Sequence, residues 1–411
     1  MISRKFLRSR DRAFNFFATP SKLKYTLIIA VTGAVIALLI YWGEAEWETI
    51  CSALLSILFV WALGALLKRI MYLNEDRRKV TSDNDVIGKI YDRDKYLRCL
   101  EIEGKKQSFY YEISYRHDDR KKIVIRDNPS KKYALPGKID NHFTNLLSAH
   151  GNSFIENKPT VRLDRYEETD SSLILETSRS DFYSHLATNR AMDYLIDRKV
   201  SIRALYEYGP FLSPLEESEL SNHIGINALI FLNDGAVILK HRNSSSTISK
   251  NCLTSSVATR LIIDDHREKI TYSKEKMNDP ILTVMFEKLN FPRSAGIEID
   301  FLGFARDVYE GGKPQFYFDV RVDMSSKEYL GKYCRGECSQ KCREIDEDKA
   351  AYVCSRVYVP DDESDKLEVF YYDLKAPDNI KSRTLFPERS LYVNMYLSKE
   401  FKTRFNVNCL V

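Results

Sequence analysis

The sequence predicts an α+β protein with a membrane hairpin at its N-terminus, and three observations support this prediction. Two uncharged, apolar runs of eighteen residues stand near the start of the chain, at residues 25–42 and 50–67. Alternating apolar and polar residues then recur in short runs separated by Gly, Pro and charged turns, which is typical of strands. Segments with apolar residues at helical spacing lie between these runs. With 411 residues, the chain can bury a full core without disulfides.

The net charge of +4 hides a strong asymmetry along the chain. Residues 1–24 carry seven basic residues against one acidic residue, whereas residues 81–411 have a net charge of −2. Proteins that bind nucleic acid through its phosphates carry a concentrated positive field. We therefore do not expect the large C-terminal part of the chain to bind nucleic acid.

The two apolar runs have the length that an α-helix needs to cross the hydrocarbon layer of a membrane. The linker 43–49 is acidic and both outer flanks are basic, so the positive-inside rule places both chain ends in the cytoplasm. A signal peptide is the alternative for the first run, but a second run follows before any soluble domain. We expect a basic cytoplasmic segment (1–24) and a two-span hairpin (25–67) in the inner membrane.

A small β-rich segment is expected directly after the hairpin, at residues 68–140. The runs YLRCLEIEG, SFYYEISYR and KKIVIRD each favour a strand. Pro and Gly between residues 128 and 138 mark the predicted end of this segment.

A second unit is predicted at residues 141–330. Its first expected elements are a short helix at 143–147, strands at 161–166 and 172–176, and a helix at 182–196. The clearest local signal follows, because INALIFL and AVILKHR flank the turn Asn233-Asp234-Gly235, which favours positive φ and predicts a hairpin. A helix around 280–289 and the strands IEIDFLGFARD and FYFDVRVD complete the unit.

The last segment, residues 331–411, is predicted to hold a cysteine-containing loop and a C-terminal β element. The runs LEVFYYDL and SLYVNMYL alternate and favour strands. Four cysteines with the spacing C-x3-C-x3-C-x11-C could bind Zn²⁺ in a tetrahedral site; they are Cys334, Cys338, Cys342 and Cys354. A loop of ordinary reduced thiols is the alternative, since the spacing is not the usual C-x2-C pair.

The stretch HIGINALIFLNDGAVILKHRNSSS resembles the opening hairpin of Nudix domains, whose second strand ends in basic residues that face nucleotide phosphates. The resemblance implies a Nudix-like α/β/α sandwich over residues 141–330. It also implies a ligand site, with candidate contacts Lys240, Arg242, Ser245, Arg260, Glu287 and Arg306. Each of these residues also has an ordinary interpretation, as a turn former or a solvated surface residue.

The Nudix box, G-x5-E-x7-R-E-U-x-E-E-x-G-U, is incomplete in this chain. Aligned with the helix TVMFEKLNF, it keeps Glu275 and Glu287, whereas Val284 and Lys288 replace two of the family's carboxylates. Mg²⁺ needs clustered oxygen ligands to neutralise a diphosphate, so the pattern argues against hydrolysis. We expect a domain that binds a nucleotide without hydrolysing it.

Together, the hairpin and the incomplete box resemble the two-transmembrane effectors of prokaryotic antiphage defence, of the retron or cyclic-nucleotide type. The resemblance implies an inner-membrane effector of abortive infection, whose cytosolic domain senses a nucleotide or a partner and controls membrane disruption by the helices. It also implies a homo-oligomer in the active state, and an inhibitory complex with a reverse transcriptase or another defence-system partner.

Two other functions remain open at this point. One is a membrane-tethered Nudix-type nucleoside diphosphate hydrolase that uses Glu275 and Glu287 as catalytic carboxylates, assisted by Asp264, Asp265 or Asp307. The other is a scaffold that localises partners to the membrane. Mg²⁺ and Zn²⁺ are the candidate cofactors, and the binding function requires neither.

Overall fold

The computed structural model describes most of the chain between residues 80 and 410. The described ranges are 80–102, 105–148, 157–196, 199–241, 253–263, 268–329, 353–356, 366–370, 389–405 and 408–410.

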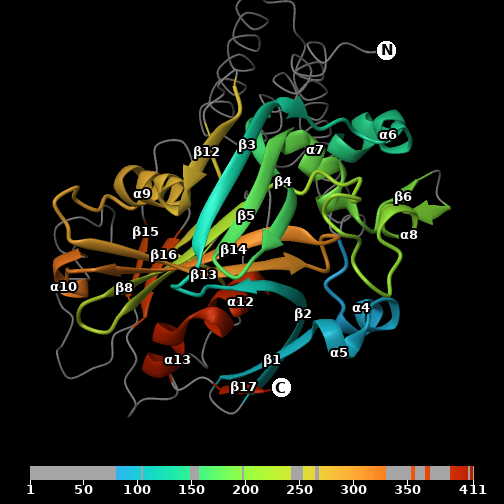
Figure 1. Ribbon diagram of the computed structural model, residues 1–411. Coiled ribbons are helices and arrows are strands. Elements are labelled where there is room, and N and C mark those ends of the chain that lie inside the picture. Colours follow the sequence, from blue (N-terminus) through green and yellow to red (C-terminus); the bar gives the residue numbers. More distant parts are fainter. Residues whose placement is uncertain are drawn as a thin grey trace, which may run out of the picture.

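Eleven of the described strands form one mixed sheet (Figure 1). Its order is β15-β16-β9-β8-β14-β13-β2-β1-β17, with β10 beside β9 and β11 beside β8. The strands are β1 (Leu97–Ile102), β2 (Lys105–Arg116), β8 (Gly225–Leu232), β9 (Val237–His241), β10 (Leu253–Thr254), β11 (Val257–Arg260), β13 (Ile297–Asp307), β14 (Lys313–Val322), β15 (Val353–Arg356), β16 (Lys366–Phe370) and β17 (Asn408–Leu410). Strands from the early, central and late parts of the chain thus share one sheet.

A second sheet of four strands packs on one face of the large sheet, in the order β12-β3-β5-β4. These strands are β3 (Lys122–Lys132), β4 (Pro159–Glu168), β5 (Ser172–Asp181) and β12 (Ile270–Ser273). The inward residues Ile125 and Leu175 join Ile226 and Phe316 of the large sheet in one buried cluster. A separate two-stranded ribbon consists of β6 (Leu195–Ile196) and β7 (Val200–Ser201).

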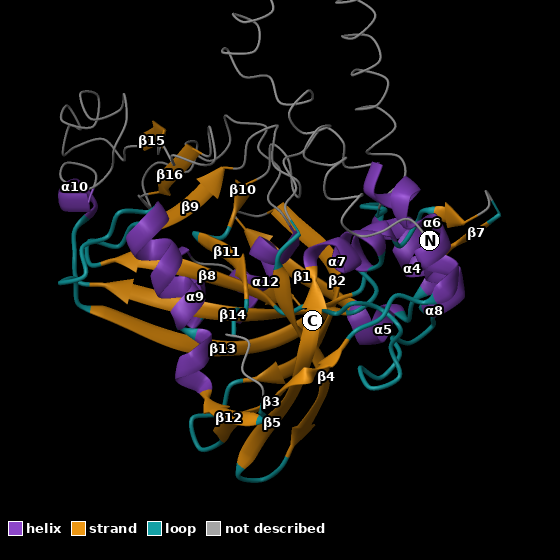
Figure 2. Ribbon diagram, turned by 90° about the horizontal axis from the view of Figure 1, so that it is seen from above, coloured by secondary structure: helices purple, strands orange, loops and turns teal. Residues whose placement is uncertain are grey.

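Helices cover the opposite face and the two ends of the large sheet. They are α4 (Asn84–Ile90), α5 (Arg93–Tyr96), α6 (Gly137–Ser148), α7 (Phe182–Ala187), α8 (Ile202–Tyr206), α9 (Asp279–Thr283), α10 (Ser326–Glu328), α12 (Arg389–Leu397) and α13 (Lys399–Phe405). Leu391 and Val393 of α12 pack against Leu229 and Phe231, which alternate along β8 with the residues that face the four-stranded sheet. Both views show α4, α5, α6 and α8 at one end of the sheets and α9 and α10 at the other (Figure 1, Figure 2).

The predicted hairpin is confirmed. Strands β8 and β9 pair in antiparallel register through Ile230 and Ile238. Gly235 has φ +92°, in the left-handed region that glycine adopts without strain. The carboxylate of Asp234 in the same turn accepts the backbone N–H of Ser326 at 2.8 Å, which ties the turn to α10.

The late run SLYVNMYL, predicted as a strand, is helix α12, so that prediction is wrong. Leu391 and Met395 lie on one side of the helix, and Val393 on another side is also buried. Because the helix is buried on several sides, its sequence lacks the polar stripe of a surface helix. Its alternating apolar and polar residues therefore resemble the pattern of a strand. The first part of the strand predicted from LEVFYYDL is present as β16, and residues 371–374 lie outside the described residues.

The helix predicted at 182–196 is also shorter than expected, because α7 ends at Ala187. The hydroxyl of Thr188 donates to the carbonyl of Ser184 at 2.7 Å, and the following residues form a 3₁₀ turn.

Strand β3 is longer than predicted, because it continues through Pro129, where the sequence predicted a boundary. The pairing of β3 with β5 is irregular there, so Pro129 leaves no regular ladder bond unmade.

The prediction of a two-span inner-membrane protein needs correction. Within the described ranges, no helix is long and apolar enough to cross a membrane. The longest of them, α6, has 12 residues and extends about 18 Å, well short of the ~30 Å hydrocarbon layer. The predicted spans 25–42 and 50–67 lie outside the described residues. The fold class is correct at the level of a mixed α+β protein, and the predicted domain limits stay predictions.

One buried carboxyl group joins α12 and α13 to the sheet. Asp319 of β14 accepts a hydrogen bond from the hydroxyl of Ser398 at 2.7 Å, and its other oxygen finds no hydrogen-bond partner in the described part of the chain. Burial raises the pKa of Asp319 to about 7, with smaller contributions of the same sign from Glu400 and Asp300. Arg321 and the Ser398 hydrogen bond act in the opposite direction.

We expect the stability of the protein to fall as pH rises from about 4 to about 7. The unfolded chain loses the Asp319 proton near its ordinary pKa of about 4, whereas the folded protein holds it until about pH 7. At about 1.4 kcal/mol per pKa unit, the loss amounts to up to about 4 kcal/mol. Asp319→Asn should abolish most of this dependence in urea unfolding of the full chain at pH 5 and pH 8. The exposed Asp323→Asn is the matched control, and an unchanged pH dependence in Asp319→Asn would refute the account.

Candidate ligand site

The candidate site is built on the turn between β13 and β14. A carboxylate oxygen of Asp307 accepts the backbone N–H groups of Tyr309 at 2.9 Å and Glu310 at 3.4 Å. Gly311 and Gly312 follow with φ +62° and +79°, which other residues rarely adopt. A Cβ atom on Gly312 would lie 2.6 Å from the guanidinium of Arg306. These hydrogen bonds and glycines restrict the backbone conformation of the turn and thereby fix the backbone position of Glu310.

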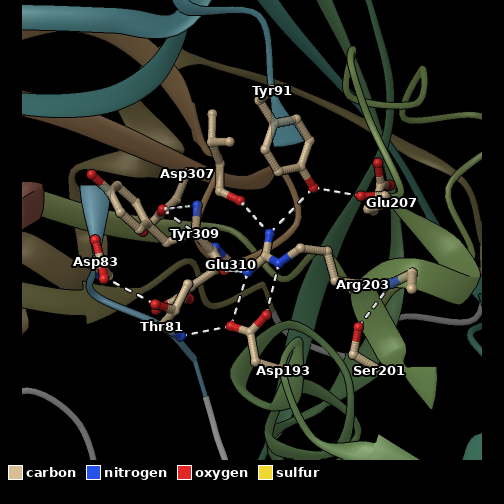
Figure 3. Close-up of polar contacts among 12 residues, drawn as sticks. Thr81, Asp83, Tyr91, Asp193, Ser201, Arg203, Glu207, Asp307, Tyr309 and Glu310 are labelled. Atoms are coloured by element: carbon tan, nitrogen blue, oxygen red, sulfur yellow. Dashed lines mark hydrogen bonds and ion pairs between the residues drawn. The ribbon is translucent and has the colours of Figure 1, made fainter. Parts of the chain in front are cut away.

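Arg203 holds this turn from the side of α8 (Figure 3). Its guanidinium donates to the carbonyls of Val308 at 3.0 Å and Tyr309 at 2.6 Å. It also donates to both carboxylate oxygens of Asp193, at 2.9 and 3.2 Å, and to the hydroxyl of Tyr91 at 3.2 Å. These bonds account for all five N–H donors of a side chain that is only 2% exposed. Arg203 is therefore fully engaged within the protein.

The partners of Arg203 extend the network to the start of the described chain (Figure 3). Asp193 also accepts the backbone N–H of Thr81 at 2.6 Å. The hydroxyl of Tyr91 donates to the carbonyl of Glu207 at 2.5 Å. Because Ser201 is the N-cap of α8 and its hydroxyl accepts the backbone N–H of Ala204, the helix presents Arg203 to the turn from a defined position.

The buried carboxylate of Glu310 lies between two cations. Arg190 Nη1 lies 2.5 Å from one carboxylate oxygen and Lys313 Nζ lies 3.5 Å from the other. Side-chain exposure is 5% for Glu310 and 7% for Lys313. Burial acts to raise the pKa of Glu310, but the two cations outweigh it and lower the pKa to about 2. The carboxylate is therefore ionised at neutral pH.

Two histidines lie beside these charges. The rings of His185 in α7 and His223 before β8 have their centroids 3.8 Å apart, and both side chains are buried. Burial holds the pKa of His223 well below its ordinary value, and nearby His185, Lys313 and Arg260 act in the same direction. His223 is therefore a neutral imidazole at pH 7, in surroundings that are cationic on balance.

Polar atoms at this position lack partners. Thr160 Oγ1, Arg190 Nε and His223 Nδ1 are buried and form no hydrogen bond to any described residue. Thr160 precedes Val161, whose carbonyl accepts the backbone N–H of Ile224, so β4 runs beside His223. A buried polar atom without a partner costs about 1–3 kcal/mol. Such atoms are expected to bind water or a ligand.

We call this group the His223 cluster. It comprises Thr160, Arg190, His223, Arg260, Glu310 and Lys313. Three of its side chains are cationic and one is anionic, so the cluster has a positive balance. Arg260 lies opposite Gly225 on β8, and Gly225 lies opposite Gln315 on β14. The cluster therefore sits where β8 and β14 begin and β11 ends.

Of the predicted ligand contacts, Arg260 joins the His223 cluster. Arg306 is buried and donates to the carbonyls of Ser213 and Gly312 and to the carboxylate of Glu112. Lys240 lies on β9 opposite Thr254, and Glu287 is exposed in the π-helical turn Val284–Lys288. Arg242 and Ser245 lie outside the described residues. The structure does not bring Arg306 or Glu287 to Arg260.

The candidate catalytic and metal-binding residues are placed as follows. Glu275 and Glu287 are both exposed, and Asp307 accepts a hydrogen bond from the hydroxyl of Tyr111 at 2.7 Å. Within the described ranges, no three His, Cys, Asp or Glu side chains are grouped so as to hold a metal ion. Asp264, Asp265 and the side chains of Cys334, Cys338, Cys342 and Cys354 lie outside the described residues.

Sequence reasoning did not select Arg190, Glu310 and Lys313. The signal that could have found them is the string Glu310-Gly311-Gly312-Lys313 between two predicted strands. Paired glycines predict a tight turn, and charged residues on both sides of a tight turn are held close together. His223 was visible as an isolated histidine before the hairpin, but its neighbours come from other parts of the chain.

Comparisons with family models and curated proteins found no relative of this chain. No family model matches the chain, and no curated protein matches it. The resemblance to two-transmembrane antiphage effectors with a degenerate Nudix-like domain is therefore corrected: no match supports it, and the described helices are too short to span a membrane. The resemblance had rested on two apolar runs and one β-hairpin, and such patterns recur in unrelated folds.

Replacing Arg203 should destabilise the protein strongly. Arg203→Met leaves the Asp193 carboxylate and two turn carbonyls without their donor, which should cost about 3–5 kcal/mol. The matched control is Arg321→Met, which removes a 42% exposed guanidinium paired with Glu298 and should cost less than about 1 kcal/mol. Urea unfolding of both full-length variants measures the difference. Equal losses in the two variants would show that Arg203 does not hold the turn.

Proposed function

We propose that the described part of the chain is a binding domain for a small phosphate-bearing ligand, such as a nucleotide, and that it senses the ligand without hydrolysing it. The observation that carries the proposal is the His223 cluster. It combines three cations with buried polar atoms that have no partner among the described residues. A phosphate group offers negative charge and several acceptor oxygens to such donors.

The chemistry of each donor fits this ligand class. The guanidinium of Arg190 has an unused Nε donor next to the Nη1 donor that binds Glu310. A guanidinium presents its donors in fixed directions to the oxygens of a phosphate group, and the ammonium of Lys313 adds a point charge. The neutral imidazole of His223 can donate from one nitrogen without adding charge.

The proposal keeps the nucleotide-sensing part of the predicted function. The alternative, a Nudix-type hydrolase, stays a prediction, and the exposed positions of Glu275 and Glu287 do not favour it. The Nudix-like sandwich over residues 141–330 also stays a prediction.

Calorimetric titration of the full chain with ADP tests the proposal. We expect binding, and we expect Arg260→Ala to weaken it by about 10-fold or more, since a hydrogen bond to a charged group contributes about 1.5–3 kcal/mol. Adenosine, which lacks phosphate, should bind much more weakly. Arg321→Ala is the matched control because Arg321 lies at the surface with Glu298 and Asp300.

Three outcomes of this titration would contradict the proposal. They are no binding of ADP, equal binding of adenosine, and an affinity that Arg260→Ala leaves unchanged. Release of phosphate from ADP in the presence of Mg²⁺, abolished by Glu287→Gln, would favour the hydrolase instead.

A further inference from the structure

Arg190 and the buried Lys313 already hold an anion, the carboxylate of Glu310. Arg190 belongs to the 3₁₀ turn after α7 and Lys313 begins β14. The two cations thus reach the same carboxylate from different elements, at 2.5 and 3.5 Å. Lys313 and Glu310 are buried, whereas the Arg190 side chain is 13% exposed. Because a buried charge is costly unless it is paired, an anion between the two cations stabilises the site.

The backbone of Glu310 is held independently of its side chain. Its carbonyl accepts the side-chain amide of Asn189 at 2.8 Å, and its N–H faces Asp307 at 3.4 Å. Arg203 holds the preceding carbonyls of the same turn. The hydrogen bonds that hold the turn therefore do not involve the Glu310 carboxylate.

We propose that Arg190 and Lys313 form the phosphate subsite of the His223 cluster, and that Glu310 occupies this subsite when no ligand is bound. This inference rests on the proposed function. The ligand class is a phosphate or diphosphate anion. This anion displaces the Glu310 carboxylate and carries more negative charge than the carboxylate does. The entering oxygens take the Nη1 and Nε donors of Arg190, the ammonium of Lys313 and the imidazole of His223.

The inference assigns Glu310 an inhibitory role. An incoming anion has to compete with a carboxylate that is covalently attached to the site and therefore present at high effective concentration. Removing the charge of Glu310 should leave Arg190 and the buried Lys313 without an anion. The neutral variant should then be less stable by itself, and it should bind free anions more tightly than the natural chain does.

Glu310→Gln in the full chain tests this, with pyrophosphate as the probe. We expect its affinity for pyrophosphate to be at least 10-fold higher than that of the natural chain. We also expect pyrophosphate to raise its thermal unfolding temperature more than NaCl at equal ionic strength does. Glu298→Gln, which removes a surface carboxylate paired with Arg321, is the matched control and should leave both quantities unchanged.

A second variant keeps the test decisive. Arg190→Gln combined with Glu310→Gln should lose the gain in pyrophosphate affinity, because the guanidinium fork is absent. The subsite is refuted if Glu310→Gln binds pyrophosphate no more tightly than the natural chain and is not stabilised by it. A Glu310→Gln variant that does not fold even in the presence of pyrophosphate also refutes the subsite. If the natural chain binds ADP while Glu310→Gln behaves in this way, the proposed function stands and the subsite does not. If neither protein binds any phosphate compound, both are wrong.

Discussion

The guanidinium of Arg203 joins parts of the chain that are far apart in sequence. It binds the carbonyls of the β13–β14 turn, the carboxylate of Asp193 and the hydroxyl of Tyr91. Its five donors match five acceptors, and this match makes the burial of the charge tolerable. Since the turn carries Glu310, the position of that carboxylate depends on Arg203. The interaction therefore supports the His223 cluster without belonging to it.

The His223 cluster differs from the Arg203 network in how well its polar groups are satisfied. Every donor of Arg203 has a partner, whereas Arg190 Nε, Thr160 Oγ1 and His223 Nδ1 have none among the described residues. Natural proteins rarely leave buried polar atoms unpaired, and exceptions often mark sites for water or ligands. Buried charges with shifted pKa values also gather at functional sites. The contrast between two neighbouring networks, one complete and one incomplete, is the physical basis for placing a ligand at the second.

The sequence predicted local structure better than it predicted the site. The hairpin around Gly235 was predictable because a turn dipeptide and two alternating runs stand side by side in the chain. Helix α12 was not, because a helix buried on several sides has no polar stripe to distinguish it from a strand. The site was mostly hidden, since Arg190 and Glu310 are 120 residues apart and only the fold brings them together. Arg260 was selected from the sequence, but its grouping with Arg306 assumed a family fold that no comparison supports.

Determining crystal structures of the full chain with and without pyrophosphate would test the central claim most directly. The account predicts that, with pyrophosphate, a phosphorus atom lies between the guanidinium of Arg190 and the ammonium of Lys313. It also predicts that the Glu310 carboxylate has rotated out while the carbonyls of the turn still bind Arg203. A structure in which Glu310 keeps both ion pairs in the presence of bound pyrophosphate, or in which the anion binds elsewhere, would contradict it.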